Sequence, residues 1–194
     1  MTEKKKLTSE FEAFRRECVD LAILINTFDA LFTEESQKES YADIAPTFFA
    51  DLNLWLINLY YLGAFRLLDK DKTIGRSNLT ANYFVDRLRT IRNSTEEIET
   101  LLARLNCYKK SIQLARHRVV AHADLEAITR EQELGAHDQS CALLFRRDLQ
   151  DFCDAVGRQV GSGPSEFINI PPGDVWNLIM ALREYKKMKA KPSD

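Results

Sequence analysis

Glycine and proline are scarce in this chain, which has only 7 glycines and 5 prolines among its 194 residues. That is about half of the share usual in globular proteins. These two residues form most tight turns, and an all-β fold needs a turn roughly every 8 to 12 residues. More than half of them, moreover, lie within residues 157–173. The composition therefore excludes an all-β protein and favours an all-α one.

Cysteine and histidine are also rare. The chain has 4 cysteines and 3 histidines, and no two cysteines have the C-x-x-C spacing. A zinc site needs a tight set of such ligands, and the sequence contains none. We therefore expect no metal site and no cofactor, and reduced, mostly buried thiols at Cys18, Cys107, Cys141 and Cys153.

Long apolar runs are absent. The most hydrophobic stretch, residues 48–68, is interrupted by polar or charged residues at positions 51, 53, 58 and 66. A membrane-spanning helix needs about 20 predominantly apolar residues. The first seven residues contain three lysines with no apolar segment directly after them, which is unlike a signal peptide. We expect a cytoplasmic protein without a membrane partner, in which residues 48–68 form a central helix.

An overall excess of positive charge is missing too, since the formal net charge is −2. Nucleic-acid-binding proteins usually carry such an excess. The charge is unevenly distributed along the chain, however. Residues 100–123 contain no acidic residue but five basic ones: Arg104, Lys109, Lys110, Arg116 and Arg118. Phosphate recognition depends on local potential. RNA therefore stays among the candidate partners, with Lys109 and Lys110 as possible contacts.

Apolar residues at three- and four-residue steps predict a bundle of long antiparallel helices. Ser9 and Glu12 form a capping-box pair, so the first helix is expected to begin near Ser9. The acidic, polar residues 33–43 should form a solvated connection. Pro46 suits the first turn of a second helix, which should run to about Leu68.

Five more helices are expected beyond a loop at residues 69–79. The third should be capped by Asn78 or Thr80, and the fourth should begin at the Ser94–Glu97 capping box and run for about 25 residues. The third helix should end near Asn93. After the fourth helix, we expect a short helix with irregular chain at 125–145 and a fifth helix at 146–160. A linker at 157–173, with an extended piece at 167–170, should lead to a last helix at 174–190 capped by Asp174. We expect one domain over 1–194, with its core in residues 9–160 and an additional C-terminal helix.

The fourth helix has an apolar seam with alternating steps of three and four residues. Its members are Ile98, Leu101, Leu105, Tyr108, Ile112, Ala115 and Val119. The next position of the series is His122. In one helix, Arg116 and His122 would lie about 120° apart around the axis and about 9 Å apart along it. Two copies of the helix across a two-fold axis could instead bring Arg116 of one chain near His122 of the other.

Structural explanations compete with this functional one. A histidine on a helix seam is often a hydrogen-bonded core residue, and basic residues on a helix often form a solvated face. Asp124 could simply end the helix. The residues of this helix therefore do not establish an activity by themselves.

The segment Arg116-His117-Arg118-Val119-Val120-Ala121-His122 resembles the R-x(4–6)-H signature of the HEPN superfamily. The following Ala123-Asp124 resembles the ending seen in the AbiU-like branch, which is grouped with phage abortive-infection proteins. Upstream, Arg66-Leu67-Leu68-Asp69 and Asn78-Leu79-Thr80 are similar to the R-L-x-D…N-L-[ST] stretch of that branch. The resemblance thus covers residues 66–124 and fits the expected order of helices.

The resemblance implies a HEPN-like helical bundle and, in many such proteins, a metal-independent endoribonuclease that works as a homodimer. It implies catalytic roles for Arg116 and His122, and supporting roles for His117, Arg118 and Asp124. It also implies a toxin–antitoxin or phage-defence context. RNA or a nucleotide would be the ligand, and an antitoxin or a nucleotidyltransferase is a possible partner.

Two other interpretations remain open at the level of sequence. HEPN relatives include non-catalytic modules that bind nucleotides or phosphates, or that dimerise beside a partner protein. A helical interaction protein in which the short signature occurs by chance is the third.

Overall fold

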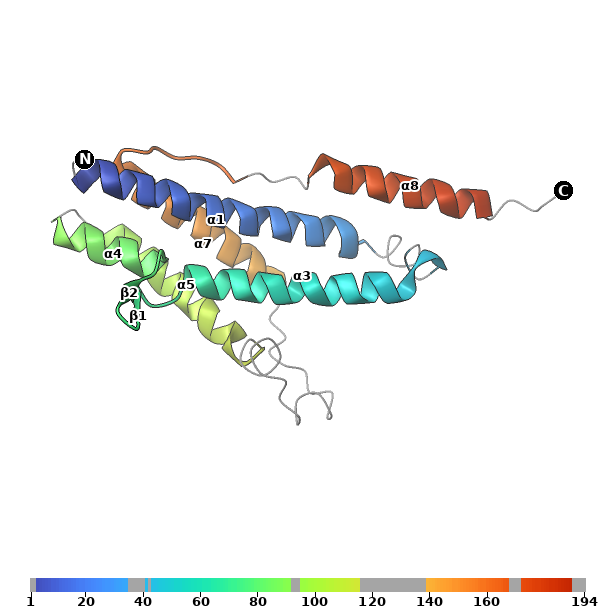
Figure 1. Ribbon diagram of the computed structural model, residues 1–194, viewed down its shortest axis with the longest axis horizontal. Helices are drawn as coiled ribbons and strands as arrows, with labels where there is room; N and C mark the ends of the chain where they lie inside the picture. Colours follow the sequence, from blue (N-terminus) through green and yellow to red (C-terminus); the bar gives the residue numbers. More distant parts are fainter. Residues whose placement is uncertain are drawn as a thin grey trace. The chain divides into compact units, whose positions relative to one another are not determined.

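The computed structural model describes residues 3–34, 41, 43–91, 95–115, 139–167 and 172–189. These residues contain six helices and one short β-hairpin, so the predicted all-α class is confirmed (Figure 1). The helices are α1 (Glu3–Phe32), α3 (Pro46–Leu67), α4 (Ala81–Thr90), α5 (Glu96–Ala115), α7 (Gln139–Val160) and α8 (Gly173–Lys189). The hairpin consists of β1 (Lys72–Thr73) and β2 (Arg76–Ser77).

The chain forms two compact units. Unit 1 comprises Met1–Val19 and Tyr61–Phe167, and unit 2 comprises Asp20–Tyr60 and Ile168–Asp194. Helices α1 and α3 each contribute one part to each unit. The single domain expected over residues 1–194 stays a prediction.

Buried phenylalanines join three helices of unit 1. The ring of Phe84 in α4 lies 5.7 Å from that of Phe11 and 5.1 Å from that of Phe14, both in α1, measured between centroids. Phe14 also meets Phe152 of α7 at 6.2 Å. All four side chains are fully buried. Because aromatic rings bury large apolar areas, this cluster anchors α4 and α7 on the N-terminal part of α1.

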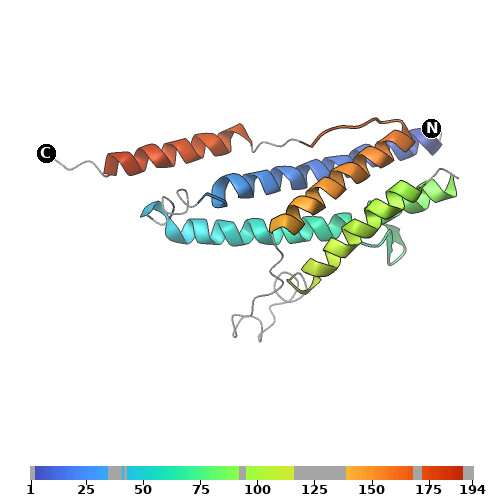
Figure 2. The same ribbon diagram turned by 180° about the vertical axis from the view of Figure 1, so that it is seen from behind.

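Helices α5 and α7 run antiparallel within unit 1 (Figure 2). Glu97 near the start of α5 pairs with Arg158 near the end of α7 at 2.7 Å. Further along, Tyr108 stacks on Phe145 with ring centroids 4.4 Å apart. The buried face of α5 contains five members of the predicted seam: Ile98, Leu101, Leu105, Tyr108 and Ile112. The seam is therefore confirmed as far as Ile112.

Unit 2 has its own core, to which α8 contributes. Ile179 of α8 is 1% exposed and belongs to a cluster with Leu31 of α1 and Phe49 of α3. Val175 and Leu182 of α8 pack against the same cluster. Their spacing of four and three residues from Ile179 is that of a single helix face.

A tight hairpin, which we did not expect, interrupts the loop between α3 and α4. Strands Lys72–Thr73 and Arg76–Ser77 pair antiparallel around Ile74 and Gly75. Both turn residues have positive φ, 49° and 75°. A two-residue turn of this kind matches the twist of a hairpin. Gly75 adopts that backbone readily, whereas isoleucine rarely does.

The start expected for the first helix is wrong. Helix α1 begins at Glu3, and Ser9 lies inside it. The reason is Leu7, which is 2% exposed, because burying this side chain extends the helix toward the N-terminus. Glu12 does not complete a capping box; its carboxylate instead forms an ion pair with Arg15.

The fifth helix is also longer than expected. Helix α7 begins at Gln139 instead of near residue 146, and it ends at Val160 as predicted. Phe145 lies in this added part, and its stacking on Tyr108 gives the segment a buried contact. Of the span 125–145, residues 125–138 lie outside the described residues.

The connection expected to be solvated contains a core residue. Tyr41 is 4% exposed and stacks on Phe49 with centroids 4.0 Å apart, within unit 2. Burial raises the pKa of its hydroxyl above the ordinary value. Residues 35–40 and 42 lie outside the described part.

The last linker and helix follow the prediction closely. Residues 161–167 are non-helical, while 168–171 lie outside the described residues. Helix α8 begins at Gly173, so Asp174 stands in its first turn and not at the capping position. A carboxylate is favourable there because the helix N-terminus carries partial positive charge.

The cysteines are free thiols, as predicted, but only two are buried. Cys18 and Cys153 are buried, Cys107 is exposed, and Cys141 is half-buried within α7. Burial, together with a hydrogen bond to Cys153, raises the pKa of Cys18 well above its ordinary value. Burial makes both of these thiols poor nucleophiles.

Within the described ranges, no helix combines the length and apolarity needed to cross a membrane.

Candidate functional site

Helix α5 leads directly into the signature predicted to carry the chemistry. The described part of this helix ends at Ala115, and Arg116 is the next residue in the sequence. The signature residues lie outside the described part of the chain: Arg116, His117, Arg118, His122 and Asp124. The structure therefore describes the helix that precedes the signature in the sequence, and the roles of these five residues stay predictions.

The charges on α5 are divided between its two ends. Its first turn contains Glu96, Glu97 and Glu99. Beyond Thr100 every charged residue of the helix is basic, and Lys109 and Lys110 lie near its C-terminal end. A polyanion is therefore repelled at the N-terminal end of α5 and attracted toward the signature end.

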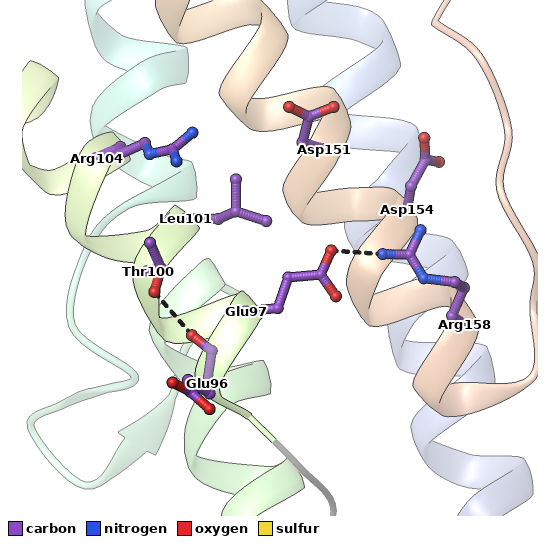
Figure 3. Close-up of a pocket in the computed structure, with 8 residues that line it drawn as sticks. All are labelled: Glu96, Glu97, Thr100, Leu101, Arg104, Asp151, Asp154 and Arg158. Carbon is purple, nitrogen blue, oxygen red and sulfur yellow. Dashed lines mark hydrogen bonds and ion pairs between the residues drawn. The ribbon is translucent and has the colours of Figure 1, made fainter.

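An acidic groove lies beside the first turns of α5 (Figure 3). It has a volume of about 640 Å³, and α5 and α7 supply its lining residues: Glu96, Glu97, Thr100, Leu101, Arg104, Asp151, Asp154 and Arg158. Glu97 reaches across it to Arg158. Four carboxylates face two guanidinium groups here, so this groove does not suit phosphate.

The upstream stretch that resembles the AbiU-like branch builds the end of α3 and the following loop. Leu67 and Leu68 are buried, whereas Arg66 is exposed and forms an ion pair with Glu17 at 2.9 Å. Thr80 caps α4, because its hydroxyl accepts a hydrogen bond from the backbone N–H of Tyr83 at 3.3 Å. The cap predicted at Asn78 or Thr80 is thus Thr80.

Asn78 has a different task, since its side chain closes the loop. Its Nδ2 donates to the carbonyl of Lys70 at 2.9 Å and to the hydroxyl of Thr73 at 2.7 Å. Its backbone N–H donates to the carbonyl of Asp71 at 2.6 Å. These three bonds hold the backbone of Lys70 in place relative to the hairpin.

Lys109 connects α5 to the end of α3. Its ammonium group donates to the carbonyl of Leu68 at 2.8 Å and lies 3.8 Å from the Asp69 carboxylate. It also lies over the ring of Phe65, 5.4 Å from the centroid. The last carbonyls of a helix lack intrahelical partners, and Lys109 satisfies one beyond the end of α3. This lysine therefore has a structural task in addition to any contact with RNA.

A second groove lies between the end of α3 and the last turns of α5, within unit 1. It has a volume of about 780 Å³ and is lined by residues of mostly basic or amide character: Leu62, Phe65, Arg66, Asp69, Lys70, Asn106, Lys109, Lys110 and Gln113. We call it the basic groove. Arg66 and Lys109 each face a carboxylate, at 2.9 and 3.8 Å. Lys70 and Lys110 are exposed, and among the described residues no carboxylate pairs with either.

The structure thus brings together residues that the sequence suggested separately. Arg66 and Asp69 of the upstream stretch share the basic groove with Lys109 and Lys110 of the charged segment. Sequence reasoning missed Lys70, Asn106 and Gln113. Lys70 lies between two aspartates in the sequence, so a local count of charges shows no positive excess there. Asn106 and Gln113 lie three residues before and four residues after Lys109, and this helical spacing is the signal that could have identified them.

The part of the chain that the structure describes holds no group of three or more histidine, cysteine or acidic side chains placed to bind a metal ion.

The comparisons with known proteins agree with this architecture. Residues 4–182 match the HEPN family model described as AbiU2. The match includes the upstream stretch, the whole of α5 and the signature, which defines the chain as a helical HEPN protein. The chain belongs to the AbiU2 family of HEPN proteins. No curated protein and no solved structure matches it.

Proposed function

We propose that this protein is a metal-independent endoribonuclease that acts in phage defence by abortive infection, in the cytoplasm. The observation that carries the proposal is the R-x(5)-H spacing of Arg116 and His122, which follow α5 in the sequence, inside a family match that extends over residues 4–182. The basic groove supports it, because it concentrates positive charge at the last turns of α5, which the signature follows in the sequence.

The residue types suit cleavage of RNA by its own 2′-hydroxyl. In this reaction the 2′-oxygen forms a bond to phosphorus, the bond from phosphorus to the 5′-oxygen breaks, and a proton passes from the first oxygen to the second. Histidine moves protons at neutral pH because its ordinary pKa is near 6.5. Arginine stays charged and donates several hydrogen bonds to phosphate oxygens.

We assign the proton transfer to His122 and the stabilisation of the phosphorane to Arg116. His117 orients one of these groups or the phosphate, and Arg118 and Asp124 support the site. Ideal helical spacing would set Arg116 and His122 about 120° apart, which is the reason to place the site between two chains, with each chain supplying one of the two groups. A homodimer is therefore part of the proposal, and an antitoxin or a nucleotidyltransferase is its candidate protein partner.

The test is cleavage of single-stranded RNA by the purified protein in EDTA, followed for wild type, His122→Ala and Arg116→Ala. We expect products ending in a 2′,3′-cyclic phosphate, and a fall in rate of at least about 100-fold in each variant. Replacing the 2′-hydroxyl at the cleaved position by hydrogen should abolish cleavage. Arg104→Ala, on α5 but in the acidic groove, is the matched control and should cleave at close to the wild-type rate.

RNA that stays intact with the wild-type protein would overturn the nuclease. A dimer that binds phosphate or a nucleotide without turnover would instead match the non-catalytic HEPN modules. The basic groove favours this second candidate more than any other feature, since its volume of about 780 Å³ lies in the range of small-ligand sites.

A further inference from the structure

The basic groove has a chemistry that the nuclease signature does not use. Two of its four cations, Lys70 and Lys110, have no carboxylate partner among the described residues; they belong to the loop after α3 and to α5 respectively. The same groove contains two amide side chains, Asn106 and Gln113, and the apolar Leu62, which is 41% exposed. Cations, amides and an exposed apolar side chain are the three kinds of group that a nucleotide requires for its phosphate, its base edge and its base face.

We propose that the basic groove binds one nucleotide of single-stranded RNA outside the pair of nucleotides that is cleaved. This inference rests on the proposed function for the identity of the polymer. The phosphate lies between the ammonium groups of Lys70 and Lys110, the base contacts Leu62, and the amides of Asn106 and Gln113 bond to the base edge.

Lys70 and Lys110 carry the charge complementarity. Asp69 also lines the groove, but its carboxylate is 3.8 Å from Lys109, and Arg66 is similarly matched by Glu17. The two pairs leave Lys70 and Lys110 as the net charge that faces an incoming phosphate. Both are exposed, and within the described ranges neither has an ion pair that phosphate binding would have to break.

The loop is built to hold Lys70 in position. Asn78 bonds to the backbone carbonyl of Lys70, and Asn82 Nδ2 donates to the carbonyl of Asp69 at 2.8 Å and to that of Leu68 at 3.2 Å. Leu68 accepts a further bond from Lys109 of α5. The backbone on one side of the groove is thereby tied to the helix on the other, which lowers the entropy cost of binding.

A single strand is the form of RNA that fits. The amide and apolar groups can contact a base only where the base is unpaired, because a duplex keeps its base edges paired and its faces stacked. The position also agrees with a flanking nucleotide, since Gln113 precedes Arg116 by three residues.

The experiment measures binding of a fluorescent single-stranded RNA by anisotropy, in a His122→Ala background so that the RNA is not consumed. The test variant carries Lys70→Gln and Lys110→Gln. The matched control carries Lys4→Gln and Lys5→Gln, which remove the same charge from exposed positions of α1 outside the groove. We expect the groove variant to bind about 10-fold more weakly at 0.1 M salt, with a slope of log affinity against log salt shallower by about 1.4.

Two further readings address the base. A duplex of the same sequence should bind more weakly than the single strand. An abasic oligonucleotide should lose affinity for the protein with an intact groove but not for Leu62→Ala, which lacks the apolar contact. Equal binding by the groove and control variants would overturn the inference, as would a groove variant that binds RNA normally but no longer binds a protein partner.

The two proposals fail separately. If the wild-type protein leaves the RNA intact, the nuclease proposal fails while the anisotropy result still decides the groove. If His122→Ala and Arg116→Ala abolish cleavage but the groove variant binds like its control, the groove assignment fails alone. Where cleavage is active, the groove variant should raise KM and leave kcat unchanged, because Lys70 and Lys110 do not touch the reacting atoms.

Discussion

Single polar side chains decide how the helices of unit 1 are connected. The side chain of Asn78 donates a hydrogen bond to the carbonyl of Lys70, and the hydroxyl of Thr80 caps the N-terminus of α4. The ammonium group of Lys109 donates to the carbonyl of Leu68, just after α3. Each side chain forms a hydrogen bond with a main-chain atom, at 2.9, 3.3 and 2.8 Å respectively. Such bonds are worth about 1 kcal/mol each, more where the partner would be left unpaired in a buried place.

Glu99 is the residue whose titration should be visible in stability. Hydrogen bonds from Arg89 and from Thr95 lower the pKa of its carboxyl from the ordinary 4.5 to about 2. A carboxyl with a lower pKa in the folded state stabilises the fold above its unfolded pKa, and this contribution is lost as the pH falls from about 4.5 to about 2. The wild type should therefore lose more stability than Glu99→Gln over that interval.

Urea unfolding at a series of pH values between 5 and 2 measures the difference. Glu96→Gln is the control, because Glu96 is an exposed carboxylate of the same helix turn without an ion pair among the described residues. Parallel curves for wild type and Glu99→Gln would contradict the assignment.

At the scale of the element, α5 combines a buried face and a charged gradient. The seam of alternating three- and four-residue steps buries one side against α7, and the exposed side changes from acidic to basic along its length. The sequence pattern was sufficient to predict the seam because a helix of 3.6 residues per turn allows one apolar face at that spacing.

Leu105→Ala tests the seam. Leu105 is 0% exposed in the middle of α5, so removing its side chain should lower the free energy of unfolding by about 2–5 kcal/mol through lost burial and a residual cavity. Cys107→Ala, two residues further on the exposed face, should change it by less than about 0.5 kcal/mol. Chemical denaturation of the two variants gives both values, and similar losses in both would exclude the buried seam.

The ends of the elements were harder to predict than their faces. The capping pair Ser9 and Glu12 gave a plausible start that the burial of Leu7 overrode. Gly75 in the sequence indicates a turn in this loop, but Ile74 has a positive φ, a backbone conformation that isoleucine rarely adopts. A helix end depends on what its flanking residues contact, and those contacts are set by the tertiary structure.

At the scale of the whole molecule, α1 and α3 pass through two compact units, and the signature follows α5 of unit 1. Unit 2 has a separate core that includes Tyr41 and Ile179. The predicted composite site adds a second chain, because helical spacing would set Arg116 and His122 about 120° apart around one axis.

Mixing two inactive variants tests that composite site. Arg116→Ala and His122→Ala should each be inactive alone. If Arg116 of one chain works with His122 of the other, refolding the two together at equal concentration makes half of the dimers mixed, each with one intact site. The mixture should then recover about one quarter of the wild-type rate.

The rate of RNA cleavage before and after co-refolding provides the measurement. The control is co-refolding of His122→Ala with the double variant that lacks both groups, which should stay inactive. A mixture that never recovers activity would rule out a site shared between Arg116 and His122 of different chains.

The sequence by itself determined the helical class, the seam of α5 and the membership suggested by the two motifs, while it left the cap of α4 open between Asn78 and Thr80. These follow from periodicity and spacing, which are local properties of the chain. Only the tertiary structure decided that Lys109 is engaged at the end of α3, that Tyr41 belongs to a core, and that Lys70 and Lys110 line one groove where no carboxylate of the described residues pairs with them. The reason is that an ion pair or a groove depends on residues distant in sequence, such as Lys70 and Lys110, whose separation in space no local pattern specifies.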